Sequence, residues 1–126
     1  MTPGLTLDAG ALIALDRDDR RVLALLHRAT ARHDTIVVPA PALAQAVRNL
    51  ARQARVARLV RQPNTVVQAL DRPDAVAVGR LLAASGTSDV VDAHVVVCAR
   101  RVGQVVITSD PDDLRRLDAT LPVFAL

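Results

Sequence analysis

The chain has 126 residues, of which 51% are apolar, and carries a formal charge of +3 at pH 7. That length suits one ordinary domain with an aliphatic core. The only aromatic residue is Phe124, which excludes stacking of nucleic-acid bases on Tyr or Trp. The positive charge permits binding to polyanions such as nucleic acid, but it does not identify such a function.

The single cysteine, Cys98, cannot form an internal disulfide and falls in an apolar run. This is typical of a small buried hydrophobic residue in a reducing compartment. The N-terminus lacks a basic region before an apolar stretch, and no uninterrupted apolar run approaches the roughly 20 residues of a spanning helix. We expect a cytoplasmic protein with no membrane segment.

Short runs rich in Val, Leu and Ile alternate along the chain with longer helix-prone segments. Strands are predicted at residues 5–7, 35–38, 65–70, 104–108 and 122–126. Helices are predicted at residues 9–15, 20–31, 42–60 with a break near Gln53, 73–84, 89–102 and 112–117. Apolar strands separated by helices favour a parallel sheet covered on both faces. We therefore predict an α/β fold, a three-layer α/β/α sandwich with a central parallel sheet, as a single domain over residues 1–126.

All 13 acidic residues are Asp, and several stand at the ends of predicted elements. Asp8 follows the first strand and Asp110 follows the strand at 104–108, at the edge where open α/β sheets bind ligands. Asp89 and Asp92 are three residues apart at the start of a helix and therefore share a face. Short carboxylates on stiff supports suit a hard cation such as Mg²⁺ or Mn²⁺. Each also has a structural explanation, because Asp caps helices and favours turns.

Four blocks of the sequence resemble the PIN domain in their order and spacing. They are LDAGALIAL at 7–15, VPAPALA at 38–44, SDVVDAHV at 88–95 and ITSDPDDL at 107–114. Within that family, the chain is most similar to the toxin nucleases of VapBC toxin–antitoxin pairs. The resemblance covers nearly the whole length and implies the same sandwich fold.

The resemblance also implies roles for individual residues. Asp8, Asp92 and Asp110 would be the metal ligands of a ribonuclease, with Asp89 beside them as a further catalytic acid and Asp113 at an additional acidic position. It further implies a Mg²⁺ or Mn²⁺ cofactor, an RNA substrate, a cognate antitoxin and a homodimer.

One position departs from the family pattern, because Gln45 stands where a Glu is usual. A neutral amide neutralises less of a cation's charge, so two hypotheses remain open. Either Asp89 supplies the missing charge and the protein cuts RNA, or the site is weakened and the protein acts by protein or RNA binding. A receiver domain would use a Lys, which the chain lacks, and a haloacid-dehalogenase-like phosphatase would have an Asp in place of Gly10.

Arginines recur every three or four residues along the predicted helix at 42–60. They are Arg48, Arg52, Arg55, Arg58 and Arg61. This spacing predicts one charged face, which either is solvated opposite the apolar side or contacts RNA or an acidic partner. We expect His94 to be a packing or surface residue instead of a metal ligand. Ser109 is a candidate for orienting a ligated water.

Overall fold

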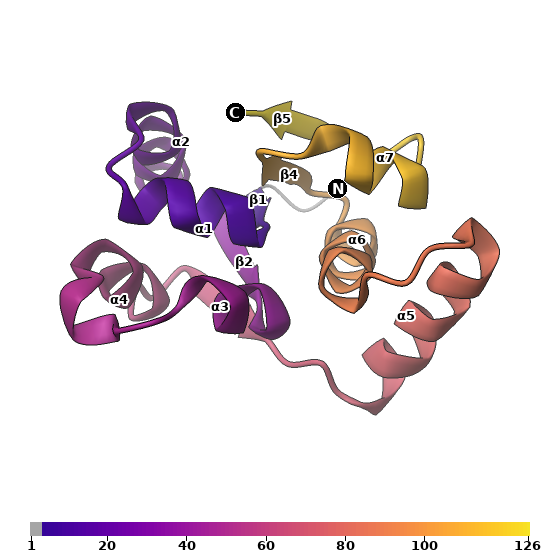
Figure 1. Cartoon of the computed structure of the whole chain (residues 1–126). Helices are drawn as coiled ribbons and strands as arrows, with labels where there is room; N and C mark the ends of the chain where they lie inside the picture. Colours follow the sequence, from indigo (N-terminus) through magenta and orange to yellow (C-terminus); the bar gives the residue numbers. More distant parts are fainter. Residues whose placement is uncertain (1–3) are drawn as a thin grey trace.

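A parallel sheet between two layers of helices forms the fold of residues 4–126, the part of the chain that this computed structural model describes (Figure 1). The strands are β1 (Gly4–Leu7), β2 (Thr35–Pro39), β3 (Thr65–Gln68), β4 (Val105–Thr108) and β5 (Val123–Ala125). The helices are α1 (Ala9–Asp16), α2 (Arg20–Ala31), α3 (Ala40–Ala46), α4 (Ala54–Val60), α5 (Arg72–Ser85), α6 (Val90–Val102) and α7 (Pro111–Leu117), with a 3₁₀ turn, η1, at Leu50–Arg52. The predicted α/β/α sandwich is confirmed.

Adjacent strands of the sheet are parallel, in the order β3-β2-β1-β4-β5. Val and Ile dominate the inner strands because branched side chains fill a pleated surface that is covered on both faces. Val38, Val106 and Ile107 are completely buried. The chain runs from β1 outward to β2 and β3, and then returns to the other side of β1 to form β4 and β5. The order therefore reverses between β1 and β4, where sheets of this kind bind ligands.

Helices α1 to α4 cover one face of the sheet and α5 to α7 cover the other, as the left and right halves of Figure 1 show. In the first layer α1 contacts α2, α3 and α4, and in the second α6 contacts α5 and α7. Helix α6 is buried along most of its length because it lies against β1, β2 and β4. No single helix in residues 4–126 is long and apolar enough to cross a membrane, and α5 and α6 reach that length and composition only as a pair bent by 109°.

The segment predicted as helix over residues 42–60, with a break near Gln53, is divided into α3, η1 and α4, so the predicted helix is too continuous before Gln53. The expected break at Gln53 is present, but the chain already leaves the helix at Val47. The buried Gln53 side chain holds this turn. Its Oε1 accepts hydrogen bonds from the amides of Arg48 at 2.9 Å and Asn49 at 3.0 Å, and its Nε2 donates to the Ala46 carbonyl at 3.0 Å. The predicted arginine stripe therefore does not share one helix face.

Element ends elsewhere follow local chemistry. Gly103 ends α6 in the left-handed conformation, with φ of 65°, as predicted for a glycine after a helix. Strand β3 ends at Gln68, two residues before the predicted end at residue 70. The reason is that Asp71 caps α5, accepting a hydrogen bond from the Asp74 amide at 3.0 Å. The chain must leave the sheet earlier to reach that cap.

Candidate active site

The reversal point between β1 and β4 opens into a cavity of about 600 Å³. Its lining includes the carboxylates of Asp8, Asp89, Asp92, Asp110 and Asp113. These residues come from the end of β1, the start of α6 and the segment that leads from β4 into α7. The four predicted catalytic acids and the additional acid at position 113 therefore meet at one cavity.

Asp8 is held between β1 and α1. It is the N-cap of α1, where its Oδ1 accepts a hydrogen bond from the Ala11 amide at 2.8 Å, and the residue is only 4% exposed. Burial raises the pKa of Asp8, and it outweighs the hydrogen bonds from the Thr108 side chain and the Ala11 amide, which lower the pKa. The Asp8 carboxylate therefore both caps α1 and lines the cavity.

Two further acids stand at the start of α6. Asp89 is the N-cap and accepts a hydrogen bond from the Asp92 amide at 3.0 Å, so the capping role considered for this pair is present. The pKa of Asp92 is raised to about 6, first by burial and then by the carboxylates of Asp89, Asp8, Asp113 and Asp110. Like charges around a half-buried acid disfavour its ionised form, and a cation among them would reverse that effect.

The loop between β4 and α7 presents Asp110. Its amide donates a hydrogen bond to Thr108 Oγ1 at 2.9 Å. Pro111 begins α7, where its missing N–H costs no helical hydrogen bond. Asp113, one turn later, forms an exposed ion pair with Arg116 at 3.4 Å. The loop is therefore short and anchored at both ends.

Gly10 permits a close approach between α1 and this loop. A Cβ at position 10 would lie 2.1 Å from Ser109 Oγ and 3.4 Å from Asp8 Oδ1. Both Gly10 and Ser109 line the cavity. The absence of a side chain at position 10 thus allows the Ser109 hydroxyl to reach the cavity wall beside Asp8.

The chemistry of this wall fits a hard divalent cation. Its donors are carboxylate oxygens on several rigid elements, which suit Mg²⁺ or Mn²⁺. Within residues 4–126, no Arg or His forms an ion pair with Asp8, Asp89, Asp92 or Asp110. Gln45, near the end of α3, is exposed and also lines the cavity. It adds a neutral oxygen donor in place of a further carboxylate.

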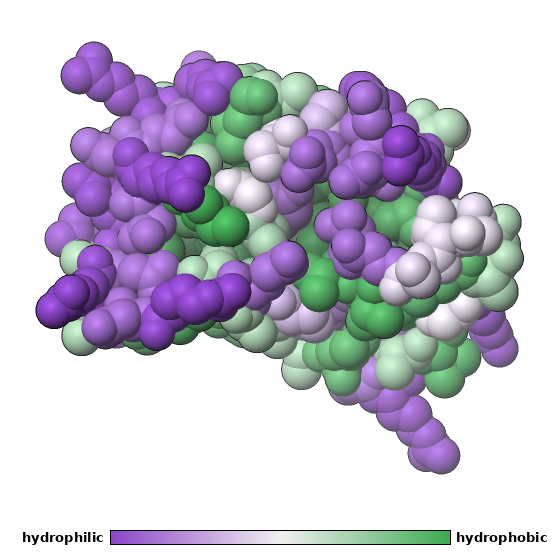
Figure 2. All heavy atoms as spheres, in the orientation of Figure 1, coloured by the Kyte–Doolittle hydropathy of each residue, from purple (hydrophilic) through white to green (hydrophobic). Residues whose placement is uncertain are grey.

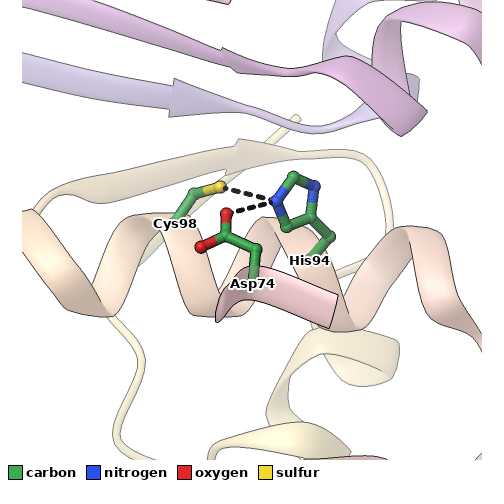
Figure 3. Close-up of side chains that lie close together, drawn as sticks. All are labelled: Asp74, His94 and Cys98. Carbon is green, nitrogen blue, oxygen red and sulfur yellow. Dashed lines mark hydrogen bonds and ion pairs between the residues drawn. The ribbon is translucent and has the colours of Figure 1, made fainter. Parts of the chain in front are cut away.

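A second cluster is buried between α5 and α6 (Figure 3). The ligand atoms of Asp74, His94 and Cys98 lie within 4.8 Å of one another. His94 Nε2 lies 2.7 Å from Asp74 Oδ2 and 3.5 Å from Cys98 Sγ. Arg101 donates a hydrogen bond to the other Asp74 oxygen. Burial raises the pKa of Asp74, but the hydrogen bonds from Arg101 and His94 outweigh it, and the resulting pKa is lowered.

This cluster fits a structural network better than a metal centre. Asp74 already has Arg101 as its counter-charge. Burial raises the pKa of Cys98 to about 12, whereas metals bind the thiolate. His94 Nδ1 is buried with no hydrogen-bond partner among the described residues, whereas a metal-ligating His usually donates its second N–H.

The sequence predicted a packing or surface role for His94, and the structure shows packing, with the residue completely buried. Its pairing with Asp74 was missed because Asp74 is 20 residues away on another helix. The available signal was a polar residue within the apolar run of α6, because a buried polar group requires a partner.

Comparison with known proteins relates this geometry to known folds. The family model of the PIN domain matches residues 5–119. A structure of FitAB bound to an IR36 DNA fragment has a TM-score of 0.65 and 15% identity, covering 96% of this chain and 94% of that chain. FitAcB from Neisseria gonorrhoeae has a TM-score of 0.62 and 16% identity, covering 95% and 96%. VapBC2 from Rickettsia felis, bound to a promoter DNA fragment, has a TM-score of 0.69 and 13% identity, covering 98% and 99%. No curated protein sequence matches the chain significantly.

Proposed function

Since this chain belongs to the PIN domain family, we propose that it is a metal-dependent endoribonuclease that hydrolyses RNA phosphodiester bonds. PIN domains are generally nucleases. The observation that carries the proposal is the convergence of Asp8, Asp89, Asp92 and Asp110 on one cavity, with burial and like charge raising the pKa of Asp92 to about 6. Carboxylates gathered in this way are suitable ligands for a divalent cation, and the cation would in turn attract the phosphate.

The acids have separate roles in this proposal. Asp8, Asp92 and Asp110 hold Mg²⁺ or Mn²⁺, which when bound polarises the phosphate and lowers the pKa of a water molecule. Asp8 is fixed by its cap on α1, so its position does not depend on the ligand. Asp89 uses Oδ1 for its cap, which leaves Oδ2 to orient the attacking water. Ser109, on the wall beside Gly10, supplies a hydroxyl for the same water.

We also propose a biological role for this nuclease, which is that of the toxin in a type II toxin–antitoxin pair. It is supported by the sequence resemblance to VapBC toxins and by the similarity to the VapBC2 structure from Rickettsia felis. The partner would be a cognate antitoxin. A cytoplasmic location agrees with an RNA substrate and with a single, buried cysteine.

We further propose that the chain forms a homodimer. Apolar side chains are exposed on and just after edge strand β3, where Val66, Val67 and Leu70 are 46%, 42% and 37% exposed. A second copy covering this edge would remove them from water and protect an open strand edge. Sedimentation that finds only monomer at micromolar concentration would contradict this proposal.

A weakened, binding-only protein is the alternative function, and Gln45 is the observation that favours it. Because Gln45 lines the acidic cavity, Gln45→Glu adds a carboxylate where the cation would bind. We expect the substitution to raise RNA cutting several-fold if the missing charge limits the reaction. Unchanged RNA binding without cutting in both proteins would favour the alternative.

The deciding experiment incubates purified protein with structured RNA and Mg²⁺ or Mn²⁺, with and without a chelator. We expect cutting that requires the metal and that disappears in Asp8→Ala and Asp92→Ala. The matched control is Asp112→Ala, because Asp112 is exposed at the start of α7 and is not part of the cavity lining. Absence of metal-dependent cutting by the wild-type protein would contradict the nuclease proposal.

A further inference from the structure

Helix α6 connects the acidic cavity to the buried cluster on α5. Its first turn carries Asp92, which lines the cavity. A different side of α6 carries His94 and Arg101, which are about two turns apart and share one face. This face meets Asp74 of α5 (Figure 3). Asp92 and His94 are separated by about 200° around the helix axis, so a rotation of α6 that alters the contact with α5 also changes the direction of Asp92.

The Asp74 carboxylate binds α6 at two points along its length. Its Oδ2 lies 2.7 Å from His94 Nε2, and its Oδ1 accepts a hydrogen bond from Arg101. Although burial raises the pKa of Asp74, the hydrogen bonds from Arg101 and His94 lower the pKa below its usual value. An ionised carboxylate only accepts hydrogen bonds, so His94 Nε2 carries the proton and donates it to Oδ2. Attachment points about 10 Å apart along the helix axis fix the rotation of α6 and its height against α5.

The other contacts of α6 are apolar. Its completely buried aliphatic residues are Ala93, Val95, Val96 and Ala99, and the helix lies against β1, β2 and β4. Figure 2 shows hydrophobic side chains between the positions of α5 and α6, whereas hydrophilic residues gather over α2 and α4. Apolar burial has no preferred direction, but the strength of a hydrogen bond falls steeply with its angle. The contact with Asp74 therefore defines the rotation of α6 more sharply than the apolar packing does.

Asp74 is itself held in place. Its amide donates a hydrogen bond to the Asp71 cap at 3.0 Å, and Arg101 binds the carboxylate oxygen that does not face His94. The side chains of Asp74 and His94 are 2% and 0% exposed, so water does not compete for the bond between them. A residue that orients a binding group has to be fixed in this way by its own neighbours.

We propose that Asp74 and His94 are positioning residues for the candidate metal site, because their hydrogen bond fixes the rotation of α6 and with it the direction of Asp92. The inference rests on the proposed function, which gives Asp92 a cation to hold. Neither residue lines the cavity. A rotation of about 20° would move a carboxylate that lies about 6 Å from the helix axis by about 2 Å. Metal–ligand distances have to hold within about 0.2 Å, so the cluster on α5 controls affinity from outside the site.

The test measures the Mn²⁺ affinity of the purified protein, without RNA, from the electron paramagnetic resonance signal of the free ion. His94→Leu fills a similar volume but has no donor, and we expect it to weaken Mn²⁺ binding about tenfold. His94→Gln should restore most of the lost affinity, because its side-chain amide donates to Asp74. The matched control is Val78→Ala. Val78 is buried one turn after Asp74 on the same face of α5, so the control lowers stability in urea and should leave the affinity unchanged.

A second variant reaches the same network from the surface. Arg101→Met keeps an apolar stem and removes the group that holds the Asp74 carboxylate, at a side chain that is 45% exposed. We expect it to weaken Mn²⁺ binding in the same direction as His94→Leu. It therefore decides the question if His94→Leu does not fold, which circular dichroism would reveal.

Unchanged Mn²⁺ affinity in the folded His94→Leu or Arg101→Met protein would overturn the inference even if the wild-type protein cuts RNA. An equal loss in Val78→Ala would also contradict it, because the cluster would then act only through stability. A loss confined to the network variants and restored by His94→Gln would support it, and absence of RNA cutting would in that case contradict only the nuclease proposal. If the wild-type protein takes up no Mn²⁺, both the inference and the metal site are wrong.

Discussion

The cavity at the strand reversal holds one buried and one half-buried aspartate, Asp8 and Asp92, and the second cluster holds the buried Asp74, but the two sites compensate the charge differently. Asp74 receives hydrogen bonds from Arg101 and His94, which lower its pKa despite burial. Asp92 faces four other carboxylates, and its pKa rises to about 6. A buried acid with its own counter-charge stabilises a fold, whereas acids gathered without one lower stability and are retained for a ligand. The difference favours a structural role for the Asp74 cluster and supports the catalytic role that we propose for the cavity.

The largest expected effect is on stability at the structural cluster. Asp74→Ala leaves Arg101 and the buried His94 without their acceptor, and we expect it to lower the free energy of unfolding by about 3 kcal/mol. Urea denaturation followed by circular dichroism measures this change, with Asp112→Ala as the exposed control. A loss no larger than that of the control would show that the network does not stabilise the packing of α5 on α6.

The opposite sign is expected at the cavity. Asp92→Asn removes one charge from the acidic group, and without metal it should raise the free energy of unfolding by about 1 kcal/mol after allowance for solvent screening. Thermal denaturation in EDTA should show a Tm increase of about 4 °C. Mg²⁺ should then raise the Tm of the wild-type protein, because a ligand stabilises only the state that binds it. The increase should be much smaller for the variant. A lower Tm for the variant in EDTA would contradict the functional assignment of the cavity.

The pH dependence of stability should reveal the same repulsion between Asp92 and the neighbouring carboxylates. The folded-state pKa of Asp92, about 6, lies above the ordinary value of 3.8 for an aspartate. Between these two pH values the folded protein therefore holds a proton that the unfolded chain releases. The contribution of this group to stability is therefore lost as pH rises through 6 and regained as pH falls toward 4. Metal-free protein should melt at a higher temperature at pH 5 than at pH 7, and Asp92→Asn should reduce the difference. An equal or larger difference in the variant would exclude Asp92 as its source.

The cavity could be predicted from the sequence because each acid adjoins the end of an element. Asp8 directly follows β1 and Asp110 follows β4 after one residue, so their meeting depends only on the strand order. Their charge state could not be predicted, since the pKa of Asp92 depends on burial and on four carboxylates, three of which come from other segments. The sequence pattern alone was sufficient for the layers and the parallel sheet.

The features that the sequence analysis missed or misplaced have a common cause, which is tertiary contacts. The helix pattern over 42–60 is amphipathic, yet the buried Gln53 side chain replaces helical hydrogen bonds and holds the turn after Ala46. The pairing of His94 with Asp74 likewise joins two helices. In both cases a polar side chain forms a hydrogen bond to a residue outside its own helix. The periodicity of a sequence describes neighbours along one element and therefore cannot predict such a bond.

The smallest expected effect concerns the approach of α1 to the β4–α7 loop. Gly10→Ala introduces a Cβ 2.1 Å from Ser109 Oγ, so the hydroxyl must rotate away from its place beside Asp8. The substitution also improves helix propensity by about 1 kcal/mol, and the net change in stability should be small. In a double-mutant cycle, removal of the hydroxyl by Ser109→Ala relieves the clash, which predicts a coupling free energy of about 0.5–1 kcal/mol in urea denaturation. Cutting should fall in Gly10→Ala and should fall no further when Ser109→Ala is added, because both changes displace the same hydroxyl. Additive losses of cutting would show that Gly10 acts on the acids themselves, independently of Ser109.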